Sequence, residues 1–164
     1  MIPRYSREKM TAVWSQENKY RKWLDVEVAA CEAMVKLGKV PAAAVENIKA
    51  KAVINVDRID AIEKVTKHDV IAFVSSLTEV IGDDGRFIHM GLTSSDVLDT
   101  ALAVQLREAS GILLEDLDEL LAVLKRRAIE HKNTLMIGRS HGIHAEPITF
   151  GLKLALWYAE IARN

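Results

Sequence analysis

Hydrophobic positions recur at helical spacing along nearly the whole chain. Between Ser15 and Leu37 they form a single stripe that repeats about every 3.6 residues, as expected for one buried face of a helix. This stripe contains Tyr20, Trp23, Leu24, Val28, Cys31 and Met34-Val35. Ser15 is placed to cap the start of this helix, and Gly38 followed by Pro41 is expected to end it.

Three further helices are predicted before residue 82. The first covers residues 42–52, and the second is capped by Asp57. The third runs from about Asp69 to Ile81. The second helix is expected to bury Ile59, Ile62 and Val65. Residues 82–85 (Gly-Asp-Asp-Gly) predict a turn, and residues 86–92 are predicted to be extended or irregular.

The segment from Ser95 to His131 is apolar on more than one face. One stripe contains Leu98, Leu102, Ala109, Leu113, Leu117, Leu120 and Leu124, and a second contains Val97, Ala101, Val104, Ile112, Leu114 and Leu121. A helix with two apolar faces must be covered by several neighbours. We therefore expect a helical bundle that is completed by other subunits.

The last predicted helix begins at Glu146-Pro147, because proline is favoured in a first helical turn. Its apolar pattern is still running at Asn164 without a stop signal, so the chain is expected to be a truncated part of a longer protein. The predicted fold class is all-α. An N-terminal helical domain is expected over residues 1–92, followed over residues 93–164 by the beginning of a long-helix bundle domain.

Composition excludes several classes of function. With 22 basic and 23 acidic residues, the net charge of −1 gives no electrostatic reason to bind nucleic acid or an anionic membrane. Aromatic residues, at 5%, are too sparse for a base-stacking platform. Cys31 is the only cysteine and is expected to pack as a small hydrophobe. Without a secretory or membrane-spanning apolar run, the default compartment is the cytoplasm.

Three of the five histidines lie in polar segments that interrupt the helical pattern. These segments are residues 67–69, 89–96 and 138–144. Imidazole is the side chain whose unperturbed pKa allows proton transfer near neutral pH. The pattern therefore indicates a site assembled from separate stretches of chain and suited to proton transfer around an anionic substrate.

Two of these segments, taken alone, also fit ordinary structural roles. Thr93 with Asp96 resembles a capping box, which would place the hydroxyls at the N-terminus of the long helix, a natural anion site. Simple capping is the competing interpretation. His68 would equally fit a surface or capping histidine, and His89 a histidine held inside a packed loop.

The segment from Gly138 to Pro147 is the most informative one. Its glycines flank residues 139–141 (Arg-Ser-His) and leave room for a ligand to approach. His141 and His144 could be a metal pair, but zinc normally needs a third protein ligand, so a metal-free acid–base role fits better. His131, beside charged neighbours, is expected to be solvated and without function.

These segments together resemble the adenylosuccinate lyase family of the fumarase/aspartase superfamily. Four motifs occur in that family's order: residues 4–6 (RYS), 67–73 (KHDVIAF), 89–101 (HMGLTSSDVLDTA) and 138–147 (GRSHGIHAEP). The similarity runs the length of the chain. It implies a fumarase/aspartase-like helical fold.

The resemblance also implies an activity. Family members release fumarate from adenylosuccinate to give AMP, and perform the same cleavage on the succinylated aminoimidazole carboxamide ribotide of purine biosynthesis. Both reactions are anti β-eliminations across a C–N bond that use no metal or organic cofactor. The enzymes of this family are homotetramers whose active sites combine residues of three subunits, so a nucleotide substrate and copies of the same chain are the implied partners.

Several residue roles follow from the resemblance. His141 would be the general acid that protonates the leaving nitrogen, and His68, the second catalytic residue, would lie close to it, orient the substrate and share in the proton transfer. Arg4 and Tyr5 would hold the nucleotide, at its phosphate. His89 would favour the phosphate region when protonated.

The same resemblance assigns four more binding residues. Lys67 and Asp69 would contribute from either side of His68, while Thr93 and Ser94 would bind the succinyl carboxylate. The chain departs from the family where Ser140 replaces a usual threonine and where Lys67 replaces a frequent arginine. Serine keeps the hydroxyl, whereas lysine loses the planar fork that allows a bidentate contact.

The family's catalytic base is a serine on a flexible loop that would lie far beyond Asn164, so the isolated chain is expected to be inactive. Two alternatives stay open. One is a sister lyase acting on argininosuccinate, aspartate or a cycloisomerase substrate. The other is a non-catalytic helical module that uses its apolar long helix for assembly.

Overall fold

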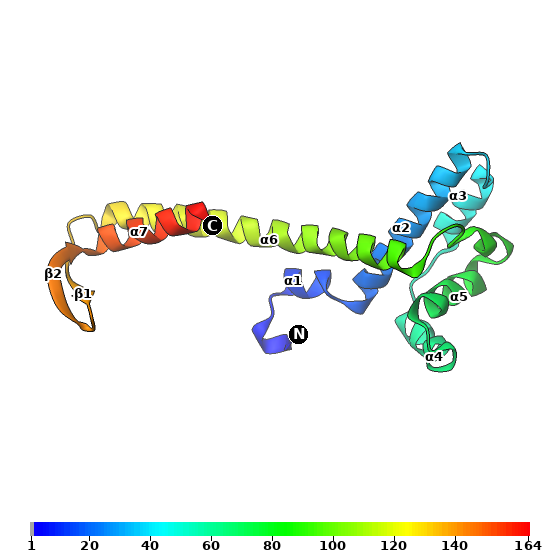
Figure 1. Ribbon diagram of the computed structural model, residues 1–164, viewed down its shortest axis with the longest axis horizontal. Coiled ribbons are helices and arrows are strands. Elements are labelled where there is room, and N and C mark those ends of the chain that lie inside the picture. The colour runs from blue at the N-terminus through cyan, green and yellow to red at the C-terminus, as the bar shows by residue number, and fades with distance from the viewer. Residues whose placement is uncertain (1) are drawn as a thin grey trace. The chain divides into compact units, whose positions relative to one another are not determined.

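The computed structural model describes residues 2–164, which fall into two compact units divided between Ala109 and Ser110 (Figure 1). Helix α6, Ser94–Glu130, contributes residues to both. The first unit otherwise contains η1 (Pro3–Tyr5), α1 (Glu8–Val13), α2 (Gln16–Lys36), α3 (Ala42–Lys51), α4 (Val56–Thr66), α5 (Asp69–Ile81) and η2 (Asp83–Phe87). Within the described residues, no helix has the length and apolarity needed to cross a membrane.

Helix α2 begins and ends where the sequence predicts. The Ser15 hydroxyl accepts a hydrogen bond from the Asn18 N–H at 3.1 Å, which satisfies a backbone donor that the first helical turn leaves free. At the other end Gly38 adopts a φ of +70°, a conformation that glycine takes without steric cost. Cys31 is buried on this helix, as predicted.

The core of the first unit is built around three aromatic rings on α2 and α5. Tyr20 stacks on Phe73 with ring centroids 5.9 Å apart, and Trp23 meets both rings edge-on at 5.1 and 5.4 Å. Such pairs add about 0.5–1.5 kcal/mol each beyond the burial of their area. All three side chains are at most 2% exposed, so α2 and α5 are held together at this level of the fold.

Helix α4 differs from its prediction. Asn55 caps it by accepting from the Arg58 N–H at 3.0 Å, so the cap lies two residues before the predicted Asp57. Asparagine and aspartate are equally good caps, so the sequence alone did not separate them. Ile59 is buried as expected, but Val65 is 83% exposed near the end of the helix, and its predicted inward orientation is wrong.

The link between α5 and α6 is also more regular than predicted. Gly82 makes the turn with a φ of +80°, but the chain then continues as the 3-10 helix η2 through Phe87. The prediction of extended or irregular chain from residue 86 is therefore wrong at its start. The segment from residue 88 to residue 93 is irregular, as expected.

The second unit contains a hairpin that the sequence analysis did not predict. Strands β1 (Leu135–Ser140) and β2 (Ile143–Thr149) pair antiparallel through a two-residue turn, His141-Gly142. Both turn residues have positive φ, +51° and +73°, as a type I′ turn requires. The described residues are otherwise mostly helical, so the all-α class holds with this one two-stranded addition.

Helix α7, Phe150–Arg163, begins later than predicted. Pro147 lies in β2 opposite Ile137, and the helix is capped instead by the Thr149 hydroxyl, which accepts from the Leu152 N–H at 3.2 Å. Proline is tolerated there because it lies in a two-stranded ribbon with free edges. Gly151, in the first turn of α7, packs directly against the backbone at the end of α6.

We expect Gly151→Ala to destabilise the second unit. A Cβ at this position would overlap the Ala128 carbonyl oxygen and would lie 2.7 Å from Lys132 Cα, and backbone atoms cannot yield cheaply. Overpacking of this kind costs about 1–3 kcal/mol. Gly111→Ala is the matched control, because a Cβ at Gly111 of α6 meets nothing within 4 Å. Chemical denaturation should show lower stability for Gly151→Ala alone, and equal stability of both variants would contradict the close approach.

Candidate functional site

Four of the predicted site residues line one cavity in the first unit. His68, His89, Thr93 and Ser94 surround a space of about 420 Å³. They come from the start of α5, the irregular link and the start of α6. The remaining lining residues belong to α5: Val70, Ile71, Val74 and Ser75. The structure thus brings together polar groups from two of the three segments that the histidine pattern indicated.

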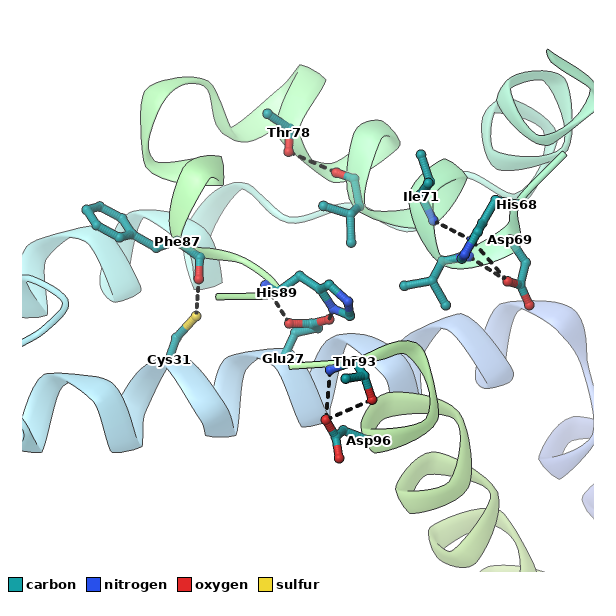
Figure 2. A network of polar contacts seen from close by, with 12 residues as sticks. Glu27, Cys31, His68, Asp69, Ile71, Thr78, Phe87, His89, Thr93 and Asp96 are labelled. Atoms are coloured by element: carbon teal, nitrogen blue, oxygen red, sulfur yellow. Dashed lines mark hydrogen bonds and ion pairs between the residues drawn. The ribbon is translucent and has the colours of Figure 1, made fainter. Parts of the chain in front are cut away.

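His68 is positioned by the junction between two helices. Lys67 ends α4 in the left-handed conformation, with a φ of +55°, and His68 is then the N-cap of α5. Its Nδ1 accepts a hydrogen bond from the Ile71 N–H at 3.4 Å, as Figure 2 shows. An accepting Nδ1 carries no proton in the neutral ring, so the hydrogen is on Nε2. His68 can therefore offer Nε2–H to a ligand as a donor.

The neighbours of His68 do not line this cavity. The Asp69 carboxylate accepts from the Val70 N–H at 2.8 Å and borders a separate hollow of about 300 Å³ that includes Trp14 and Lys19. Lys67 borders an open hollow on α4 with Asp60, Glu63 and Lys64. Asp69 Oδ1 is 3.6 Å from His68 Nδ1.

His89 rests on a buried carboxylate. Glu27 of α2 is only 1% exposed, and its Oε1 lies 2.6 Å from His89 Nδ1. Its other oxygen, Oε2, accepts the His89 backbone N–H at 2.8 Å. His89 has a φ of +64°, an uncommon conformation for any residue other than glycine. Figure 2 shows the Glu27 carboxylate directly beneath the His89 ring.

Thr93 and Asp96 form the predicted capping interaction at the start of α6. The Asp96 carboxylate accepts the Thr93 N–H at 2.7 Å and the Thr93 hydroxyl at 3.1 Å. These two hydrogen bonds, the backbone one first, hold the pKa of Asp96 below its usual value, and a protonated His89 lowers it further. Thr93 and Ser94, at the N-terminus of α6, line the cavity, so the positive end of the helix dipole borders it, with the Asp96 carboxylate beside it.

Arg4 and Tyr5 lie in η1 and do not line the three hollows described above. The Arg4 guanidinium stacks over the Tyr5 ring at 4.9 Å from its centroid, and Tyr5 is 72% exposed. The pair is thus a cation next to an exposed aromatic ring, a combination that can contact a phosphate or a base.

His141 lies at the exposed tip of the hairpin in the second unit. Arg139 Nη1 donates to the Gly142 carbonyl at 3.4 Å across the turn, and His144 is paired with Arg139 on the opposite strand. Gly138 is required at this bulge, because a Cβ would lie 2.6 Å from the Glu146 carbonyl oxygen. In the part of the chain that the structure describes, no three His, Cys, Asp or Glu side chains gather as a metal-binding group.

His131 is less solvated than predicted, with its side chain 23% exposed. Its ring packs against Phe150 with centroids 5.1 Å apart, and its Nδ1 lies 3.2 Å from the Thr134 hydroxyl. Its Nε2 is buried without a hydrogen-bond partner among residues 2–164. Phe150 of α7 and Thr134 therefore cover part of the ring, a contact that residue spacing along one helix could not show.

Glu27 is the site residue that sequence reasoning missed. It lies four residues after Trp23 and four before Cys31, so it stands on the apolar stripe of α2. A carboxylate on a buried helix face needs a partner, because an unpaired buried charge is costly. A glutamate on an apolar stripe is a signal that the sequence contains. Its partner, His89, lies 62 residues away and cannot be identified from the sequence.

Comparisons with known proteins identify the family and the fold of the chain. A family model described as "Lyase" matches residues 4–164. The chain is 56% identical over 167 residues to the adenylosuccinate lyase of Aquifex aeolicus, and 50% identical over 164 residues to that of Bacillus subtilis; each match covers 100% of this chain and 38% of the relative. A solved 3-carboxy-cis,cis-muconate lactonizing enzyme from Pseudomonas putida matches with a TM-score of 0.90 at 31% identity, covering 97% of this chain and 38% of that one.

The chain therefore belongs to the Lyase family and has the mostly helical fold of the fumarase/aspartase superfamily. Within that family it is similar to the N-terminal part of adenylosuccinate lyases, and it spans about 38% of the length of those relatives. The resemblance read from the four motifs is confirmed.

The Asp96 cap gives a pH-dependent prediction. A carboxyl whose pKa is lowered by folding stabilises the protein above its unfolded pKa, and this contribution is lost as the pH falls through the folded value. We expect Asp96→Ala to be less stable than the wild type at pH 7, with a difference that is constant down to about pH 4 and shrinks below it. Asp99→Ala, at an exposed position of the same helix, is the control. Unfolding free energies at pH 7 and pH 3 test this, and an unchanged difference would contradict it.

Proposed function

We propose that the full-length protein containing this chain is an adenylosuccinate lyase. The observation that carries the proposal is the 56% identity over all of this chain to an adenylosuccinate lyase, against 31% to the lactonizing enzyme that shares the fold. The substrates would be adenylosuccinate and the succinylated aminoimidazole carboxamide ribotide. The products would be fumarate with AMP or with the corresponding amide ribotide, in the cytoplasmic pathway of purine biosynthesis.

The proposed reaction is an anti β-elimination without a metal or organic cofactor. A base removes a proton from the succinyl β-carbon, and the electron pair is held as an aci-carboxylate. The C–N bond then breaks, a C=C bond forms, and His141 donates a proton to the departing nitrogen. In this proposal the base is a serine that lies outside this chain.

The cavity in the first unit is proposed to hold the succinyl part of the substrate. His68 can donate from Nε2, and the N-terminus of α6 supplies backbone N–H groups and a positive dipole end. Thr93 already donates its hydroxyl to Asp96, so it would have to turn to reach a carboxylate, whereas Ser94 lines the cavity directly. These donors suit the charge that develops on a carboxylate during proton abstraction.

The remaining residues are proposed to bind the nucleotide. Arg4 and Tyr5 would contact the phosphate, joined by His89, and Lys67 and Asp69 would contribute beside His68. The open, cation-bearing surface of η1 supports the first of these assignments. Lys67 can supply a point charge but not the bidentate contact of an arginine.

Assembly as a homotetramer, with active sites shared between subunits, is part of the proposal. Its support is the exposure of large apolar side chains on α6 and α7 in the second unit: Leu113 54%, Leu114 62%, Ile129 62%, Leu152 61% and Leu156 56%. Apolar surface on this scale marks an interaction face. We also propose that the domain boundary lies at residues 92–93, just before α6.

A sister lyase and a non-catalytic assembly module are the competing functions. A sister lyase acting on argininosuccinate or aspartate should leave adenylosuccinate intact and ignore AMP. An assembly module should show no turnover of any substrate, and its function should survive replacement of His141. The proposed enzyme differs from both in requiring a nucleotide and this histidine.

We expect His141→Gln in the full-length protein to lower kcat for adenylosuccinate by at least about 100-fold, because a positioned general acid contributes about 10²–10⁴-fold. His144→Gln is the matched control, since it changes an exposed histidine of the same hairpin. Fumarate release measured by absorbance, with oligomeric state checked by light scattering, tests the prediction.

If His141→Gln and its control were equally active, His141 would not be the acid. If the wild type released no fumarate, the proposed function itself would fall. Purified residues 1–164 are expected to show no sustained turnover, because the base lies outside them.

A further inference from the structure

Glu27 is the only charged side chain among the buried residues in the described part of the chain. Burying a carboxylate is costly unless hydrogen-bond donors replace the water it loses. Both donors that Glu27 receives come from one residue, His89, at 2.8 Å from the backbone N–H and 2.6 Å from the ring. A buried carboxylate devoted to a single histidine points to a role in placing that histidine.

The carboxylate holds both the backbone and the ring of His89. His89 has a φ of +64°, a conformation that costs energy unless the surroundings enforce it. The same helix, α2, also fixes the chain two residues before His89, because the Cys31 thiol donates to the Phe87 carbonyl at 3.3 Å. Helix α2 is in turn fixed by Trp23 in the aromatic core. Helix α2 thus fixes the position of His89.

The contact also sets the proton on the ring. An ionised carboxylate can only accept, so His89 Nδ1 must be the donor. Nε2 is then the one ring nitrogen of His89 that Glu27 does not bind, and His89 lines the cavity with His68 and Ser94. When the ring is doubly protonated, the Glu27–His89 pair is neutral overall, and Nε2–H can donate to an anion without leaving the buried carboxylate uncompensated.

We propose that Glu27 is a positioning residue, which fixes the ring and the Nδ1 proton of His89 so that Nε2 is the atom presented to an anionic group of the substrate. The proposal rests on the proposed function for the identity of that substrate. Glu27 itself does not touch the substrate, since it is buried beneath the ring (Figure 2).

The test is Glu27→Gln in the full-length protein. Each of the two Glu27 oxygens accepts one of these hydrogen bonds, and glutamine replaces one oxygen by an NH2 group, which is a donor, so in this geometry it cannot accept from both the N–H and the Nδ1–H of His89. We expect KM for adenylosuccinate to rise about 10- to 100-fold, the loss typical of a hydrogen bond to a charged group. kcat should change little, because an anion contact made equally before and during the reaction affects binding alone.

Glu108→Gln is the matched control. Glu108 pairs with Lys22 at 2.5 Å in the same unit and does not line the cavity, so its change should leave KM unaltered. Equal KM values for Glu27→Gln and the wild type would overturn the proposal. Circular dichroism checks folding, and if Glu27→Gln does not fold, Glu27→Met removes the buried charge at similar volume and is tested in the same way.

A double-mutant cycle separates positioning from a merely structural role. If Glu27 acts through His89, then Glu27→Gln should add nothing to KM once His89→Ala is present. Additive effects of the two substitutions would overturn the proposal, because Glu27 would then act independently of the ring.

Failure of the proposed function is recognised separately, because the wild type would then not turn over adenylosuccinate. In that event a crystal structure of Glu27→Gln decides the role of Glu27. A rotated or displaced His89 ring supports positioning, and an unchanged ring overturns it.

Discussion

The stacking of Tyr20, Trp23 and Phe73 is the interaction on which the geometry of the first unit depends. It joins the N-terminal half of α2 to the N-terminal half of α5. Glu27 follows Trp23 by about one helical turn, and His68 caps the start of the helix that carries Phe73. The two histidines of the cavity are therefore placed by one apolar contact, although neither of them belongs to it. The apolar packing of α2 against α5 thus determines how far apart the polar side chains of the cavity lie.

A second constraint is local and backbone-based. Three residues other than glycine have positive φ among the described residues, and they are Lys67, His89 and His141. All three stand in the motifs that carry the family resemblance. Such conformations are sparsely populated and persist where the surroundings enforce them, often at functional sites. Each one turns the chain sharply at a break between helices or strands. The turn at Lys67 places the next residue, His68, beside the cavity, whereas His89 and His141 are themselves the turning residues, His89 at the cavity and His141 at an exposed turn.

Much of the helical fold could be predicted from sequence because helix starts and stops are local signals. Ser15 and Gly38 delimit α2 as predicted, and α5 spans Asp69–Ile81 as expected. The hairpin is harder to predict, because Pro147 also fits the first turn of a helix, although His141-Gly142 between short strands is itself a turn signal. The partner of Glu27 could not be predicted, since it depends on a contact 62 residues away. For the same reason the sequence predicts His89 as a site residue but does not predict its contact with Glu27.

The close approach at Gly151 has a consequence for motion in the second unit. The Gly151 and Phe150 amides donate to the carbonyls of His131 and Thr134 at 2.9 and 2.8 Å, so the two ends of the hairpin are clamped to each other and to α6. Sub-global opening must break this clamp, whereas the turn at His141 can fluctuate without doing so. The hairpin is therefore anchored where it joins α6 and α7. The His141 imidazole at its tip moves when strands β1 and β2 bend together, and not by rotation of the hairpin about a hinge.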